Sequence, residues 1–254
     1  MNGSTLCRRA TYSGCLLVAA SLVVAPIARA QGSGDGFLFR SPGGSFRVWT
    51  GYDRALANSP IFKFVTDTFT LSKSSFGAFA IGADLAVRVA PRAELVFSAG
   101  WAGSKAGSEY RHWIGSDSLP IRQTTSLERV PLTVNLKWYV TAPGQSIGRF
   151  AWVPTRLAPF VGAGGGLMWY RFQQYGDFIN FADSSVVNDA LASEAWTGSL
   201  DAFAGMDVAL GARYVVTARA QYTWARSHLG ADFVGPNEVD LSGLSLTVGA
   251  GVRF

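Results

Sequence analysis

Nine charged side chains fall on one side of segments in which every second residue is apolar. Five are basic and four are acidic: Arg88, Arg129, Lys137, Arg219, Arg253, Asp84, Glu94, Asp201 and Asp207. A buried charge without a partner is costly, so the near-balance predicts a network of ion pairs inside the fold. We favour a network that fills and closes the interior. A polar path or gate for small solutes is the alternative.

The sequence offers little for catalysis. Its two histidines, His112 and His228, both fall in segments expected to be loops. Ser227 precedes His228, and serine with histidine can form a nucleophile and its general base. Adjacent residues of a strand point to opposite faces, however. The sequence therefore predicts no catalytic residues and no enzyme.

The sequence also contains no motif for binding a dinucleotide or a metal ion. The run 162–167 (GAGGGL) has leucine where a dinucleotide-binding fingerprint needs its last glycine, and no helical pattern follows. The acidic residues of the expected loops match no calcium-binding loop. We therefore expect no cofactor and no metal.

Alternating apolar residues define the elements that would position the nine charges. The alternating stretches are 45–52, 79–89, 94–101, 129–140, 159–171, 196–210, 214–224 and 244–254. A tilted strand needs about 9–11 residues to cross a membrane, and an even number of strands can close without a free edge. The pattern predicts an all-β fold, a transmembrane eight-stranded antiparallel up-and-down β-barrel. The faces of the glycine-rich stretch 159–171 are left unassigned.

The first thirty residues are expected to be a cleaved signal peptide. Arg8 and Arg9 precede an apolar run, and Ala28–Arg29–Ala30 has the small-residue pattern of a cleavage site. Both cysteines lie inside this segment, so the mature chain would have no disulfide. We predict a signal peptide at 1–30, a flexible leader at 31–44 and the barrel at 45–254.

Composition narrows the class of protein. Hydrophobic residues make up 48% of the chain and charged residues 15%, which is typical of a membrane protein. Beyond the signal, no run reaches about 18 apolar residues, the minimum for a membrane-spanning helix. The net charge of +5 includes three arginines of the signal. The mature chain is thus only weakly basic, and we expect no nucleic-acid partner.

Aromatic residues cluster near both ends of the expected strands. Those predicted to form two girdles at the membrane interfaces are Tyr52, Trp101, Trp138, Trp169, Trp196, Tyr214, Tyr222 and Trp224. Tyr139, Tyr170 and Phe254 fall at the same levels. A soluble ligand-carrying barrel would instead turn its apolar rows inward, but the polar rows lack the dense Lys and Glu of a solvated surface.

The links between the stretches alternate in length. Links 90–93 and 211–213 are short, whereas 54–76, 104–123, 173–195 and 227–243 are long and polar. Link 141–157 breaks this alternation by its length. In membrane barrels the short turns face the periplasm, so both termini are expected there.

Three stretches and the signal peptide resemble a known family. The stretches 158–172 (APFVGAGGGLMWYRF), 89–100 (VAPRAELVFSAG) and 244–254 (LSLTVGAGVRF) are similar to the small outer-membrane β-barrel superfamily, with its OmpA- and OmpW-like barrels. The resemblance covers nearly the whole mature chain. It implies the outer membrane of a Gram-negative-type bacterium, with Phe254 as the signal that the barrel-assembly machinery reads. Because the sequence leaves no room after Phe254, we expect that the peptidoglycan-binding domain of the full OmpA arrangement is absent.

This architecture hosts many activities, so the resemblance leaves function open. We expect a non-enzymatic protein with a structural or surface-interaction role carried by long extracellular loops. A narrow porin-like pore, or a transporter for small or hydrophobic solutes of the OmpW-like kind, is the first alternative, and a lipid A-modifying enzyme the last. The expected partners are outer-membrane lipid and lipopolysaccharide, and we favour a monomer.

Overall fold

The computed structural model describes residues 36–115, 118–180, 185–230, 232–233 and 237–254. These residues belong to one compact unit, Gly34–Phe254. The predicted signal peptide and residues 31–35 of the predicted leader lie outside the described residues. Within the rest of that leader, Leu38 pairs through its backbone with Trp152.

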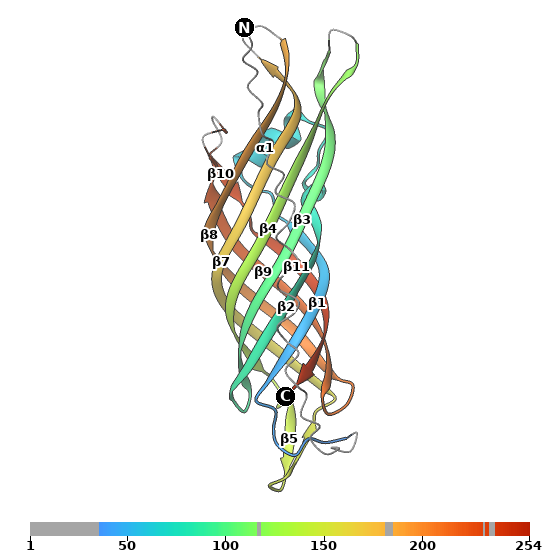
Figure 1. Cartoon of the computed structure of the whole chain (residues 1–254), viewed down its shortest axis with the longest axis vertical. Coiled ribbons are helices and arrows are strands. Elements are labelled where there is room, and N and C mark those ends of the chain that lie inside the picture. Colours follow the sequence, from blue (N-terminus) through green and yellow to red (C-terminus); the bar gives the residue numbers. More distant parts are fainter. Residues whose placement is uncertain (1–35, 116–117, 181–184, 231, 234–236) are drawn as a thin grey trace, which may run out of the picture. The chain divides into compact units, whose positions relative to one another are not determined.

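Eight long strands close into a ring (Figure 1). They are β1 (Gly44–Ala55), β2 (Gly77–Ala90), β3 (Ala93–Ile114), β4 (Pro120–Tyr139), β7 (Leu157–Asn180), β8 (Ser185–Ala209), β9 (Tyr214–His228) and β11 (Gly243–Arg253). Each pairs antiparallel with its neighbours, and β1 closes the ring against β11 from Ser45↔Arg253 to Ala55↔Gly243. The predicted eight-stranded antiparallel up-and-down barrel is confirmed.

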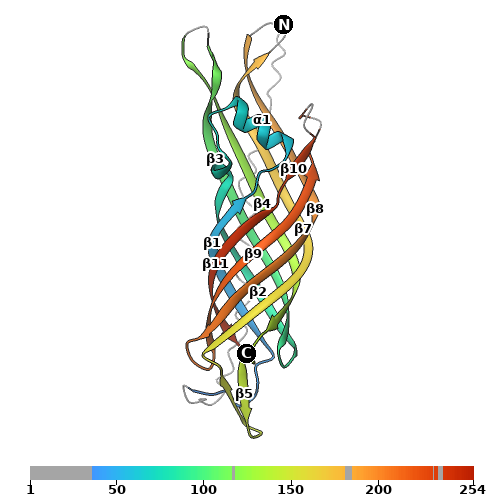
Figure 2. The ribbon, with the colours of Figure 1, turned by 180° about the vertical axis from the view of Figure 1, so that it is seen from behind.

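Shorter elements lie at the two ends of the barrel. The α1 end carries helix α1 (Pro60–Thr68), the 3₁₀ helix η1 (Lys73–Phe76) and strand β10 (Glu238–Asp240). The opposite end, which we call the short-turn end, holds the β2–β3 and β8–β9 turns and the hairpin of β5 (Gly144–Ile147) and β6 (Ala151–Pro154). Figure 2 shows α1 at one end and the hairpin at the other.

The apolar rows of the strands face outward and the polar rows face inward. Leu85, Leu246 and Val248 are 42%, 59% and 57% exposed, whereas Asp84 and Arg253 are 4% and 7% exposed. This arrangement excludes a water-soluble carrier, in which the apolar rows would line the interior. A barrel with an apolar outer face is instead suited to lipid.

The same alternation shows which residues of the glycine-rich strand β7 face the barrel interior. Phe160, Met168 and Tyr170 are buried inside the barrel, while Leu167 is exposed outside. The glycines between them make room for ring packing: a Cβ at Gly162 would overlap the Phe203 ring. Glycine is therefore used here for close approach inside a narrow barrel.

Several segments expected to be loops are instead ordered elements. Strands β3 and β4 extend through most of 104–123, and β7 and β8 through most of 173–195, as two long hairpins. The outward residues of these extensions are mostly polar, so the apolar alternation ends although the backbone ladder continues. Link 54–76 forms α1 and η1, and link 141–157 forms the β5–β6 hairpin.

Helix α1 forms because its local sequence supports a start and one apolar face. Pro60 occupies the first turn, where its missing N–H costs nothing. Ile61, Phe62 and Val65 then fall on one side and are buried. Among the described residues, no helix is both long and apolar enough to cross a membrane.

The predicted girdle residues lie on the outward face. Six are exposed and two, Trp169 and Tyr222, are half-buried; the exposed ones are Tyr52, Trp101, Trp138, Trp196, Tyr214 and Trp224. Tyr214 and Trp224 are about ten residues apart on β9, the length of strand that crosses a bilayer. We call the outward surface between these two levels the apolar band.

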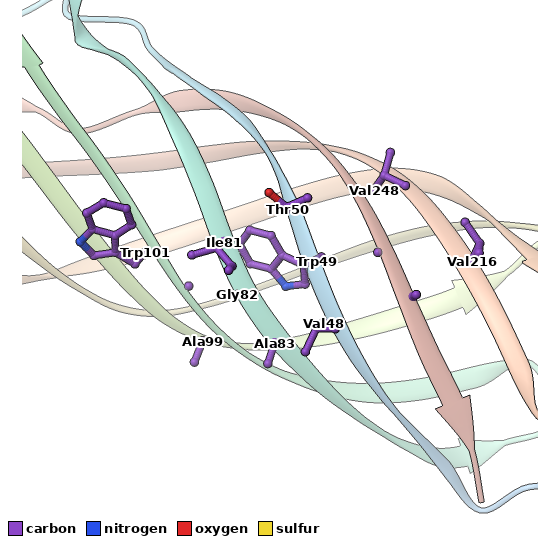
Figure 3. Close-up of a pocket in the computed structure, with 13 residues that line it drawn as sticks. Val48, Trp49, Thr50, Ile81, Gly82, Ala83, Ala99, Trp101, Val216 and Val248 are labelled. Carbon is purple, nitrogen blue, oxygen red and sulfur yellow. The ribbon is translucent and has the colours of Figure 1, made fainter. Parts of the chain in front are cut away.

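A shallow groove of about 750 Å³ runs across the apolar band over β9, β11, β1, β2 and β3 (Figure 3). Small residues such as Ala83 and Ala99 form its base, and Ile81, Trp101 and Val248 are among its larger lining residues. Its apolar lining is consistent with contact to lipid tails.

Candidate functional site

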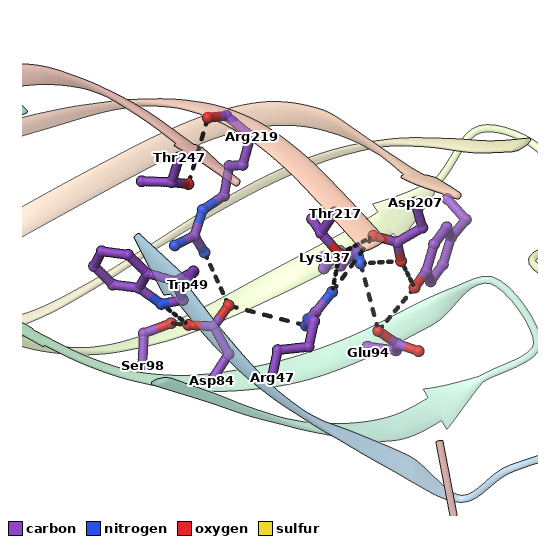
Figure 4. Close-up of polar contacts among 11 residues, drawn as sticks. Arg47, Trp49, Asp84, Glu94, Ser98, Lys137, Asp207, Thr217, Arg219 and Thr247 are labelled. Atoms are coloured by element: carbon purple, nitrogen blue, oxygen red, sulfur yellow. Dashed lines mark hydrogen bonds and ion pairs between the residues drawn. The ribbon is translucent and has the colours of Figure 1, made fainter. Parts of the chain in front are cut away.

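The barrel interior at the level of the apolar band is filled by a network of charges centred on Asp207 (Figure 4). The Asp207 Oδ2 atom accepts hydrogen bonds from Lys137 Nζ and from the Tyr139 hydroxyl, both at 2.7 Å. Its Oδ1 atom accepts one from Thr217 at 2.7 Å and lies 3.5 Å from Arg47 Nη1. Strands β1, β4, β8 and β9 thus converge on one carboxylate.

A second carboxylate, Asp84, organises the neighbouring part of the interior. Its Oδ1 atom accepts from Trp49 Nε1 at 2.9 Å and from Ser98 Oγ at 2.7 Å. Its Oδ2 atom accepts from Arg219 Nη1 at 3.2 Å. Arg47 links the two centres, because its Nε atom lies 4.0 Å from Asp84 Oδ2 (Figure 4).

Aromatic rings complete the packing around the cations. Lys137 Nζ lies 3.9 Å from the centroid of the Phe160 ring, and the Arg219 guanidinium carbon lies 5.4 Å from the centroid of the Trp49 ring. The ring faces attract cations. Glu94 belongs to the same cluster of charges. Its Oε2 atom lies 3.0 Å from the Tyr139 hydroxyl and 3.8 Å from Lys137 Nζ. We call Arg47, Asp84, Glu94, Lys137, Tyr139, Asp207, Thr217 and Arg219 the lumen network.

The structure brings five of the nine predicted charges into this network and leaves four outside it. Arg129 instead pairs with Asp53 at 2.9 Å and donates to the Leu241 carbonyl at 3.1 Å. Asp201 accepts from Thr223 at 2.6 Å and has no ion-pair partner among the described residues. Arg129 and Asp201 are thus buried in the interior, as predicted for inward charges, but lie outside the lumen network.

Arg88 and Arg253 are the other two predicted charges that lie outside the lumen network. Both lie near the short-turn end, with their guanidinium carbons each 5.7 Å from the centroid of the Trp152 ring. No carboxylate within the described part of the chain pairs with either. Trp152 is itself buried, so the β5–β6 hairpin covers the interior at this end.

Sequence reasoning missed three important members of the interior. Arg47 was not counted, although it lies on the polar side of its stretch, between Phe46 and Val48. The sequence predicts Tyr139 and Tyr170 at the levels of the interfacial aromatics, but both side chains are buried inside the barrel. Each of these three residues lies two positions after an inward-facing residue of its strand. Because side chains alternate between the faces of a strand, this spacing predicts that all three face inward.

The interior leaves little free space at the level of the lumen network. The cavity there measures about 10 Å³ and is lined in part by Arg47, Asp84, Lys137 and Arg219. That volume is near the minimum for a single water molecule. The side chains around this cavity are therefore closely packed, which supports the interpretation of the network as a plug.

A hydrophobic core closes the α1 end. The ring of Phe62 lies 4.7 Å from that of Phe76 and 5.8 Å from that of Phe172, measured between centroids. Leu127 and Tyr170 are buried in the same core. The Tyr170 hydroxyl donates to the His228 carbonyl at 2.7 Å, which satisfies its polar atom.

The two histidines lie away from this interior. His112 is an exposed residue of β3, and His228 is the last residue of β9. Ser227 is half-buried while His228 is exposed, as expected for neighbours in a strand. Among the described residues, no group of His, Cys, Asp and Glu is arranged to hold a metal ion.

Comparison with known proteins gives likenesses of fold. No protein-family model matches the sequence, and the comparison with curated proteins gives no match. The chain is similar to the outer membrane protein OprG of Pseudomonas aeruginosa, with 15% identity, a TM-score of 0.46, and coverage of 85% of this chain and 99% of that one. It is also similar to Neisserial surface protein A, with 14% identity, a TM-score of 0.42, and coverage of 84% and 97%.

A third similar structure is Ail, the attachment invasion locus protein of Yersinia pestis, with 12% identity and a TM-score of 0.41. The alignment covers 83% of this chain and 99% of that one. At these identities the likeness concerns the fold alone, and the role of this barrel is argued from its own residues. By its closed ring of eight strands, its outward apolar band and its filled polar interior, the chain has the fold of the small outer-membrane β-barrels.

Proposed function

We propose that this protein is a non-enzymatic outer-membrane anchor whose two long hairpins form a surface for interaction outside the cell. The observation that carries the proposal is the closed interior. The cavity within the lumen network measures about 10 Å³, the aromatic core packs across the α1 end, and Trp152 is buried at the short-turn end. A barrel whose interior is packed in this way is suited to anchoring the hairpins that extend from it.

The hairpins rise well beyond the apolar band. β7 continues for about ten residues past Trp169, and β8 begins about ten residues before Trp196. At about 3.3 Å per residue this length is comparable to that of the band itself. Val186 and Val187, near the tip of the β7–β8 hairpin, are about half exposed. Adjacent residues of a strand point to opposite faces, so the two valines offer a partner one apolar contact on each side of the hairpin.

We further propose an orientation in which the α1 end faces outward and the short-turn end faces the periplasm of a Gram-negative-type bacterium. Its support is the usual placement of short turns in such barrels. In this orientation both Gly44, at the start of β1, and Phe254 lie on the periplasmic side. Outer-membrane lipid and lipopolysaccharide would contact the apolar band.

Cysteine labelling of intact cells tests this orientation. Both native cysteines lie in the predicted signal peptide, so a single introduced thiol reports alone. Val187→Cys should react with a membrane-impermeant maleimide on whole cells, because it sits near the tip of the β7–β8 hairpin. Arg92→Cys, in the exposed β2–β3 turn, should react only after the cells are lysed. Labelling of Arg92→Cys on intact cells would reverse the orientation.

A specific feature of the wall favours transport as a second candidate function. The β8–β9 ladder ends at Ser199↔Ala225. Beyond it the strands are joined by side chains, as where Thr197 donates to the Arg226 carbonyl at 2.6 Å. A pocket of about 550 Å³ lies at this seam, lined by buried Ser199 and by outward Trp224. Through such a seam, small apolar molecules would diffuse laterally from the barrel into the bilayer.

Two measurements, one on the purified barrel and one on whole cells, separate the anchor from the transporter. In planar bilayers the purified barrel should show no discrete conductance openings, because the lumen network blocks ions. Cells that express it should take up the apolar fluorophore 1-N-phenylnaphthylamine no faster than cells that do not. Discrete openings would contradict a closed lumen, and faster fluorophore uptake without openings would favour the route through the seam.

A further inference from the structure

A pocket of about 230 Å³ opens at the α1 end, apart from the lumen network and from the seam. It is formed by α1, by the extensions of β3, β7 and β8, and by residues 232–233. Half of its ten lining side chains are aromatic: Phe64, Phe69, Tyr110, Phe178 and Phe233. An aromatic-lined hollow of this size is smaller than a typical drug-sized site, so it would suit a small ligand.

The pocket has a buried floor and an open rim. Phe69, Tyr110 and Phe233 form the floor and are at most 9% exposed. Phe64 and Asp232 belong to the rim, and both are exposed. A ligand entering from solvent would therefore pass a carboxylate and then meet ring surfaces.

Asp232 is the one charged residue in the lining. Its Oδ2 atom accepts a hydrogen bond from the Ala192 amide at 3.3 Å, which places the side chain beside β8. No cation within the described part of the chain pairs with it. Two basic residues of the α1 end are engaged elsewhere: Arg111 donates to the carbonyls of Thr66 and Leu71, and Lys73 to Asn58.

The remaining polar atoms add no positive charge. The Tyr110 hydroxyl oxygen accepts from the Ile179 amide at 3.4 Å, and burial raises the pKa of Tyr110, so its ring stays neutral at physiological pH. Gln174 donates to Thr125 at 3.4 Å. The lining therefore combines a negative rim with rings whose faces attract cations.

We propose that this pocket binds a small organic cation, an alkylated ammonium whose apolar groups contact the rings while its charge faces Asp232. Ring faces and a carboxylate both favour a positive charge, whereas a simple metal ion would find too few oxygen ligands here. The proposal is independent of the anchor role, because it concerns a site that neither the closed lumen nor the hairpin tips require.

Choline and its uncharged isostere 3,3-dimethylbutan-1-ol test the proposal by titration calorimetry. The protein is refolded in a nonionic detergent, since phosphocholine headgroups would compete for the site. Choline should bind saturably with one site per chain and at least about tenfold more tightly than the alcohol, since cation–π and carboxylate attraction act on the charge alone. Asp232→Asn should weaken choline about threefold to fivefold, because Asp232 is exposed and a surface ion pair contributes at most about 1 kcal/mol, and it should leave the affinity for the alcohol unchanged.

Asp189→Asn is the matched control. Asp189 is an exposed acid of β8 that accepts from the Ala190 amide and does not line the pocket. Its removal should change choline binding by less than about twofold, as expected for a screened surface charge. Three results would overturn the proposal: no saturable binding of choline, equal affinity for the alcohol, or an equal loss in Asp189→Asn and Asp232→Asn.

Discussion

Replacing Asp207 with alanine is expected to destabilise the barrel by about 3–5 kcal/mol, the cost of removing one partner from a buried ion pair. Asp207 is 2% exposed and accepts from Lys137, Tyr139 and Thr217. Without it, Lys137 keeps only Glu94 at 3.8 Å. Arg47 keeps Asp84 at 4.0 Å as its nearest carboxylate, with its hydrogen bond to Thr217 at 3.4 Å. Two buried cations would lose their closest carboxylate at once.

Urea unfolding of the refolded barrel, followed by tryptophan fluorescence, measures this loss. The matched control is Glu109→Ala, which breaks the surface pair of Glu109 with Arg122 at 3.0 Å. Those side chains are 41% and 73% exposed, so the control should cost less than about 1 kcal/mol. Equal losses in the two variants would mean that the lumen network adds nothing beyond surface pairing.

A double variant distinguishes a missing partner from general damage to the fold. Replacing both members of a buried ion pair with apolar residues is often neutral. Lys137→Met combined with Asp207→Leu should therefore recover much of the stability lost in either single variant. A double variant as unstable as the sum of the singles would show that the two side chains act independently.

The sequence predicts the barrel well because strand alternation is a local property. Leu85 and Asp84 are assigned to opposite faces by their adjacency alone, and the structure places them so. The same rule could have placed Arg47 and Tyr139 inside. What alternation does not supply is height: it puts Arg129 and Lys137 on one face of β4 without saying that only Lys137 reaches Asp207.

Heights depend on the stagger between strands, which long-range pairing sets. Ser45 pairs with Arg253 on one side and Ala86 on the other, and no local signal gives those registers. Link 54–76 shows a second limit of prediction from the sequence. Phe62 and Val65 have helical spacing, but their burial depends on a barrel mouth formed by distant strands. The strand extensions were missed because their outward residues are polar.

The second large effect is expected from Phe62→Ala, which should cost about 3–5 kcal/mol by leaving a cavity in the aromatic core. Phe62 is fully buried, and its ring meets those of Phe76 and Phe172. The neighbouring Phe64 is 47% exposed on the same helix. Phe64→Ala should therefore cost under about 1 kcal/mol, as expected for an exposed position.

Amide hydrogen exchange shows which parts of the barrel lose stability in Phe62→Ala. The core at the α1 end and the lumen network share no side chain, so the two should open separately. In Phe62→Ala the amides of α1 should exchange faster, while those of the β1–β11 ladder beside the lumen network keep their protection. Asp207→Ala should give the opposite pattern. If Phe62→Ala instead speeds exchange equally in α1 and in the β1–β11 ladder, the barrel unfolds as one unit and the aromatic core is part of the membrane-spanning structure.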